Sequence, residues 1–121
     1  MNPETIVQQE VLLALSGHST LFRNNCGGFK TKSGRVIKYG IANPGGSDLI
    51  GWTPLKITRE MAGRTVAIFT ALEVKTPEFI EPRNTHEMRQ EHFITVVRNA
   101  GGIADFVRSA NEATQTIKEM L

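Results

Sequence analysis

The chain has 121 residues, of which 40% are hydrophobic and 21% are charged, which is the size and composition of one folded domain. This composition excludes disorder driven by charge, and a net charge of +2 excludes a strongly cationic, histone-like protein. Because Cys26 is the one cysteine, a disulfide framework and a cysteine-based zinc site within the chain are also excluded. With no run of about 18 apolar residues and no signal-peptide pattern, we expect a cytoplasmic single domain over residues 1–121 that has no membrane partner.

In the first two thirds of the chain, one helix is followed by several short strands. Asn2-Pro3 is a typical helix start and Gly17 a typical stop, so a helix is expected over residues 3–16. Strands are expected at 20–23, 29–31, 36–39 and 48–52. The second and third of these would form a hairpin that turns at Ser33-Gly34. An excursion over 52–64 separates these from the run 65–74, the longest apolar and β-branched stretch, which predicts a central buried strand.

The last third alternates between helix and strand. Asn84 with Glu87 is typical of a capping box, and it opens a helix that is expected to run to Ala100 before Gly101-Gly102. A strand over 103–107 follows, and Ser109 repeats the capping signature before a final helix. The expected fold class is α/β, a mixed β-sheet flanked by helices in the order α-β-β-β-α-β-α, with three or more strands in the first run and a largely antiparallel meander in the middle.

The positive charge is concentrated in one segment. Residues 30–38 contain four basic residues and no acidic one, with Phe29 and Tyr39 at either end. Such a segment can follow a phosphate backbone, and a solvated hairpin tip explains the same pattern equally well.

Two polar residues fall on apolar helix faces. At about 100° per residue, Glu10 lies between Leu13 and Ala14, and Gln90 lies between Phe93 and Val97, while Glu87, Glu91 and Arg98 lie on the opposite side. A carboxylate on a buried face needs a partner. The alternative for each residue is a place at the edge of the stripe, where the side chain reaches water.

Two further carboxylates adjoin apolar strands. Asp48 opens the strand after a Gly-Gly turn, and Glu73 ends the longest run with Lys75 on the same strand face. If these carboxylates meet, a hard divalent ion such as Mg²⁺ or Mn²⁺ would hold them together. An ion held by Asp48, Glu73 and the backbone carbonyl of Val74, with Lys75 serving the attacking water or the developing charge, predicts hydrolysis of a nucleic-acid backbone.

These residues resemble a known family. Asp48 in GGSDLIG and Glu73-Val74-Lys75 in ALEVK are similar to the PD-(D/E)xK nuclease pattern. VQQEVLLAL with Glu10, and QEHFITVVRNAGGIADFV with Gln90, further resemble its VRR-NUC branch, so that the resemblance runs from about Glu10 to Val107. It implies a restriction-endonuclease-like fold and divalent-metal-dependent DNA cleavage. Stand-alone members are similar to phage-encoded enzymes, which would act in the bacterial host cytoplasm, and tend to be homodimers, some of which resolve Holliday junctions.

The resemblance and the residues together predict a site. Glu10 would hold the ion, directly or through water, from the first helix, and Gln90 would order the lysine or the water. The residues expected to grip branched DNA by charge are Arg23, Lys30, Lys32, Arg35 and Lys38. The proline of the family signature is loosely represented, since Pro44 lies four residues before Asp48 and is assigned to the turn.

Two alternatives to the nuclease are compatible with parts of the sequence. One is a catalytically silent nucleic-acid-binding module on the same fold, which the loss of an acidic or lysine position would have indicated. The other is a phosphoesterase acting on a small nucleotide, for which no aromatic pair at a useful spacing is found. His86, Arg89 and His92 have no motif that places them in catalysis, and Cys26 has no triad partner at a typical spacing.

Overall fold

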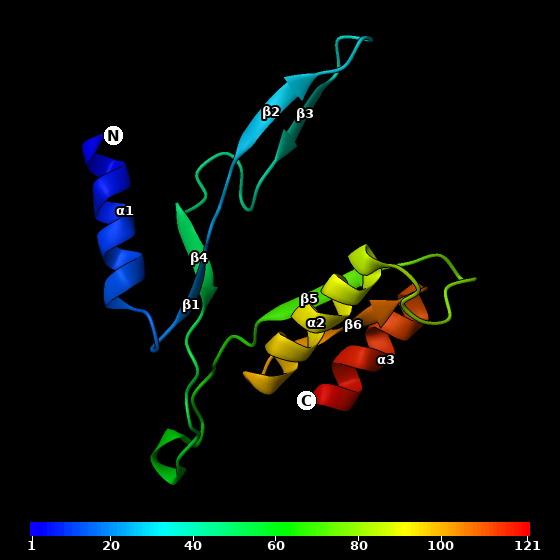
Figure 1. Ribbon diagram of the computed structural model, residues 1–121. Helices are drawn as coiled ribbons and strands as arrows, with labels where there is room; N and C mark the ends of the chain where they lie inside the picture. Colours follow the sequence, from blue (N-terminus) through cyan, green and yellow to red (C-terminus); the bar gives the residue numbers. More distant parts are fainter. The chain divides into compact units, whose positions relative to one another are not determined.

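The computed structural model describes all 121 residues, and they fall into two compact units, Met1–Leu55 and Lys56–Leu121 (Figure 1). The first unit has one helix and the second has two α-helices and a short 3₁₀ helix, and each unit has its own paired strands. The organisation of the chain as one domain stays a prediction. None of the helices combines the length and the apolar character needed to cross a membrane.

The first unit contains one helix and two antiparallel strand pairs. Its elements are α1 (Pro3–Ala14), β1 (Thr20–Arg23), β2 (Gly27–Lys30), β3 (Val36–Tyr39) and β4 (Leu49–Trp52). The β1 strand pairs with β4, and β2 pairs with β3 as the predicted hairpin. The side chain of Asn2 accepts a hydrogen bond from the Thr5 N–H at 2.8 Å and so caps α1, because an N-cap oxygen satisfies an otherwise unbonded amide.

The second unit is built on a parallel strand pair. Its elements are the short 3₁₀ helix η1 (Arg59–Met61), β5 (Thr70–Val74), α2 (Thr85–Asn99), β6 (Ile103–Val107) and α3 (Ala110–Met120). The β5 and β6 strands run parallel, and α2 forms the crossover between them. The buried apolar core comes from α2 and β6, through Ile94, Val97, Ile103, Ala104 and Val107.

Both predicted caps in this unit are confirmed. The side chain of Asn84 accepts a hydrogen bond from the Glu87 N–H at 2.8 Å, and that of Ser109 accepts one from the Glu112 N–H at 3.1 Å. Each cap begins a helix at the expected residue because the capping bond depends only on residues three apart in the chain.

The predicted strand over 65–74 is wrong in its first half. Only Thr70–Val74 forms the strand β5, and Val66 and Ile68 are exposed. The strand is also neither central nor buried as expected, because it pairs with β6 alone and none of its residues is buried. The reason for its late start lies in the partner strand: β6 begins at Ile103, after the turn at Gly101, and the Ile103 N–H donates to the Phe69 carbonyl as the pairing starts. Residues before Phe69 therefore have no strand to pair with in this unit.

Five strands precede α2, one at each of the five places where a strand is expected. The chain therefore reads α-β-β-β-β-β-α-β-α, which is the expected order α-β-β-β-α-β-α with more than three strands in the first run. The strands pair in three two-stranded sheets, β1 with β4, β2 with β3 and β5 with β6. The α/β class is confirmed, as are the antiparallel pairs in the middle of the chain, and β5 with β6 adds a parallel pair.

Candidate functional site

A chain of hydrogen bonds joins the three predicted site residues of the second unit. The Gln90 side chain, on α2, donates from Nε2 to Oε1 of Glu73 at 2.7 Å. Its Oε1 accepts a hydrogen bond from Nζ of Lys75 at 2.8 Å. Glu73 belongs to β5 and Lys75 follows it, with both side chains on the strand face that α2 covers. One amide thus fixes the carboxylate and the ammonium group at the same time.

Lys75 is also held by a second carboxylate and two rings. Its Nζ lies 3.6 Å from Oε2 of Glu87, and the two side chains are only 16% and 18% exposed. The Phe79 and Phe106 rings lie 5.4 Å and 5.8 Å from the same nitrogen, within the range of a cation–π contact. Because water is largely excluded from these contacts, the ammonium group is held more rigidly than a surface lysine.

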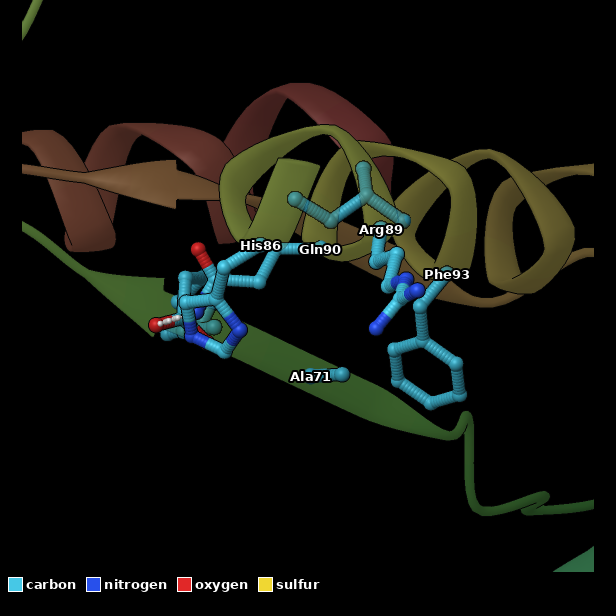
Figure 2. Close-up of a pocket in the computed structure, with 8 residues that line it drawn as sticks. Ala71, His86, Arg89, Gln90 and Phe93 are labelled. Atoms are coloured by element: carbon cyan, nitrogen blue, oxygen red, sulfur yellow. Dashed lines mark hydrogen bonds between the residues drawn. The ribbon is translucent and has the colours of Figure 1, made fainter. Parts of the chain in front are cut away.

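Beside Glu73, a pocket of about 370 Å³ opens between α2 and β5. Figure 2 shows His86 and Phe93 extending from α2 toward the strand, with Ala71 between them in the view. The residues that line it are Ala71, Leu72, Glu73, His86, Arg89, Gln90, Phe93 and Ile94. The inner face of α2 is thus apolar at one end and polar at the end where Glu73 and Gln90 meet.

The Val74 carbonyl lies at the outer edge of β5. The Ile103 N–H donates to the Phe69 carbonyl and the Lys75 N–H donates to the Val107 carbonyl, at 2.8 Å and 2.9 Å. Peptide groups alternate along a strand, so those of odd-numbered residues face β6 and that of Val74 faces away from it. In the loop that follows, a hydrogen bond from the Thr76 side chain lowers the pKa of the exposed Glu78 carboxyl.

In the first unit, Asp48 lies at a polar pocket of about 320 Å³. The residues that line it are Gln8, Arg23, Asn24, Asn25, Cys26, Gly46 and Asp48. The helix α1 contributes Gln8 to the lining of this pocket, and Glu10 is not among the lining residues. The helix α1 buries none of its side chains, and Glu10 is exposed, so the expectation that Glu10 lies on a buried face is wrong for this unit. Its role at a metal ion stays a prediction, as does that of Asp48.

Asn24 fixes the loop that leads to Asp48. Its Nδ2 donates to the carbonyls of Ile41 and Ser47 at 2.8 Å and 3.0 Å, and its Oδ1 accepts from the Ile41 N–H at 2.8 Å. Its own N–H donates to the Asp48 carbonyl at 2.8 Å. Gly46 also lies against the Ile41 carbonyl and Asn24, where any side chain would collide with the backbone. The loop is therefore tied at both of its ends to one residue.

We expect the Asn24→Ala substitution to lower the free energy of unfolding by about 2–3 kcal/mol, since three side-chain hydrogen bonds are lost at roughly 1 kcal/mol each. Urea unfolding followed by circular dichroism measures the change. The matched control is Asn25→Ala at the neighbouring exposed position, which should change stability by less than about 0.5 kcal/mol. An equal loss in both variants would contradict the assignment of Asn24 as the residue that fixes the loop.

The predicted DNA-contacting residues lie in the first unit. Lys30 and Lys38 belong to the β2–β3 hairpin, Lys32 and Arg35 to its turn, and Arg23 ends β1 beside Asp48. All five side chains are exposed. The structure therefore leaves each of these cations accessible from outside the unit.

Sequence reasoning missed Glu87 and the rings around Lys75. Glu87 was expected on the outer side of its helix as a capping residue, but its Oε1 accepts from the Arg83 N–H and its Oε2 faces Lys75. A signal was present, because Glu87 precedes Gln90 by three residues and so lies on a neighbouring part of the same face. Phe79 and Phe106 carry no comparable pattern in the sequence.

No family model matches the chain, and neither curated proteins nor solved structures gave a match.

Proposed function

We propose that this chain is a divalent-metal-dependent, structure-selective DNA endonuclease that hydrolyses phosphodiester bonds. The observation that carries the proposal is the Glu73–Gln90–Lys75 chain, in which one amide holds a carboxylate and an ammonium group side by side. A carboxylate that can bind a cation and a lysine that can neutralise a phosphate are the two groups that this hydrolysis needs.

The residues present fit a Mg²⁺ or Mn²⁺ ion. Such ions take one or two carboxylates and fill their remaining positions with water and phosphate oxygens. Glu73 uses Oε1 to accept from Gln90, and a carboxylate has about four acceptor positions in all, so it retains capacity for a ligand bond. The Val74 carbonyl at the open edge of β5 is a second hard oxygen. Asp48 and Glu10 are the further carboxylates that the proposal assigns to the ion.

The chain's own residues then have separate tasks. When bound, the ion would polarise the phosphodiester and make its water more acidic. Lys75 has three N–H donors, of which one is used by Gln90 and one is directed to Glu87, and the third is left for a phosphate oxygen or the attacking water. Gln90 keeps the ammonium group in place, so its charge is already positioned when negative charge develops on the phosphate.

The proposal extends to the fold, the substrate and the assembly. We propose a restriction-endonuclease-like arrangement of the sheet, and branched DNA such as a Holliday junction as substrate. Binding would use the charges of the hairpin rather than a base sequence, so affinity would fall steeply with salt. A homodimer is proposed because a four-way junction needs two cuts related by symmetry.

A catalytically silent nucleic-acid-binding module is the second candidate. The observation that favours it is the number of partners that Lys75 already has, namely Gln90, Glu87 and two rings. A lysine with these contacts also stabilises the packing of α2 on β5. In that case the chain would bind DNA and leave it intact.

A cleavage assay separates the two candidates. Labelled duplex, flap and four-way-junction DNA are incubated with the protein in Mg²⁺, in Mn²⁺ and in EDTA. We expect cleavage of the branched substrates with either ion and none in EDTA. Binding of the junction without cleavage in either ion would favour the silent module, and cleavage that persists in EDTA would contradict the metal-dependent mechanism.

A further inference from the structure

The β2–β3 hairpin has two faces of different chemistry. Phe29 pairs with Ile37 and Gly27 with Tyr39, while Lys30 pairs with Val36 and Gly28 with Lys38. Directly paired residues lie on one face of a ribbon, and successive residues lie on opposite faces. One face therefore presents Phe29, Ile37 and Tyr39, and the other presents Lys30, Lys38 and Val36. A Cβ added at Gly27 would meet the Tyr39 ring, and one at Gly28 would lie against the Ile37 carbonyl and next to Lys38, in agreement with this division.

Both faces are accessible. Phe29 is 54% exposed, Ile37 37% and Tyr39 52%, and none of the three ion pairs of the structure involves a hairpin residue. The sequence contains no acidic residue between Glu10 and Asp48, so the positive charges of this region have no acidic neighbour along the chain. The cationic face is thus complementary to an anion that the first unit does not supply.

The tip of the hairpin is held in one shape by Thr31. Its N–H donates to the Arg35 carbonyl at 2.8 Å, its carbonyl accepts from the Gly34 N–H at 3.0 Å, and its hydroxyl contacts Ser33 and the Arg35 N–H. Gly34 takes the positive φ of 85° that this turn requires. Lys32 and Arg35 are therefore presented from a defined turn, next to the two faces.

We propose that the β2–β3 hairpin is a binding arm for DNA with unpaired bases, whose lysine face contacts phosphates and whose Phe29–Ile37–Tyr39 face stacks its two aromatic rings on the bases. Aromatic side chains gain stacking energy on bases that are not stacked in a helix, and intact duplex offers few of these. The aromatic face would then distinguish a branch point from continuous duplex, while the lysines would bind both. This inference rests on the proposed function in taking branched DNA as the substrate.

Charge favours nucleic acid over a second copy of the chain as the occupant. Two hairpins packed through their apolar faces would cover Phe29, Ile37 and Tyr39 but leave the lysine face of each hairpin without an anion. Phosphates neutralise the same charges and release counterions. A two-stranded ribbon also has dimensions that a nucleic-acid groove accepts.

Binding in EDTA tests the arm apart from cleavage. Fluorescence anisotropy measures the affinity of the full chain for a labelled four-way junction, its duplex arm and a single strand at several salt concentrations. We expect Phe29→Leu to lower the junction-to-duplex affinity ratio about fivefold, since stacking is lost and the side chain stays apolar. Phe29→Trp should keep the ratio. Replacing Lys30 and Lys38 together by Gln should weaken all three DNAs and reduce the duplex salt slope by about 1.8.

Lys118→Gln, an exposed lysine of α3, is the control with the same chemistry outside the arm, and circular dichroism shows whether each variant folds. An unchanged junction-to-duplex ratio in folded Phe29→Leu would overturn the proposal. The proposal would also be overturned if the wild type sediments as a dimer and Phe29→Leu as a monomer while DNA binding is unchanged. The apolar face would then contact a second copy of the chain. If the wild type and the variants show the expected affinities but the wild type cleaves no DNA, the proposed function fails and the assignment of the hairpin as a binding arm is retained. If it cleaves and the variants bind like wild type, the arm fails alone.

Discussion

Replacing Lys75 with methionine is expected to lower the rate of junction cleavage at least about 100-fold, the effect typical of losing one preorganised charge-stabilising group. Methionine keeps an unbranched stem between Phe79 and Phe106 and removes the ammonium group that Gln90 and Glu87 hold. The same change should lower the free energy of unfolding by about 2 kcal/mol, because hydrogen-bonding groups of two half-buried side chains lose their charged partner. Single-turnover cleavage and urea unfolding measure the two effects separately.

The control for this prediction is Lys118→Met on α3, which makes the same chemical change at an exposed position. It should leave cleavage within about twofold of wild type and stability within about 0.5 kcal/mol. A folded Lys75→Met variant that cleaves at the wild-type rate would remove the lysine from the reaction. Its contacts with Gln90 and Glu87 would then serve only the packing of α2 on β5.

Local patterns predicted the helix starts and the position of Gln90. A cap depends on residues three apart, so Asn84 and Ser109 could be assigned without knowing the fold. Gln90 could be placed by helical periodicity because its neighbours Ile94 and Val97 are the buried residues of that face. In both cases the information needed lies within one helix.

Features that depend on packing against another segment of the chain could not be predicted from local patterns. The apolar run at 65–69 has the composition of a strand, but β6 starts too late to pair with it. The helix α1 has an apolar stripe, yet none of its residues is buried, so the position of Glu10 on that stripe did not determine its environment. The spacing of Glu87 from Asn84 predicted only a role in capping the helix. In the structure, one of its carboxylate oxygens accepts from the Arg83 N–H and the other faces Lys75.

The two half-buried carboxylates around Lys75 and Gln90 allow a test of which one binds the metal ion. Glu73→Gln keeps an oxygen that accepts from the Gln90 Nε2 and removes the charge that would hold the ion. We expect its cleavage rate in Mg²⁺ to fall at least about 100-fold, with the fold intact, since a carboxylate that binds Mg²⁺ is replaced by an uncharged amide. Cleavage across a Mg²⁺ and Mn²⁺ concentration series measures the loss.

Glu87→Gln is the matched control, because it makes the same change in a carboxylate that contacts Lys75 directly, whereas Glu73 is joined to Lys75 through Gln90. Its loss removes an ion pair and leaves the Glu73–Gln90–Lys75 chain in place, so the rate should stay within about threefold of wild type. Equal inactivation of both variants would show that the net charge around Lys75 matters rather than a ligand at Glu73. Inactivation of Glu87→Gln alone would move the metal ligand from the end of β5 to the first turn of α2.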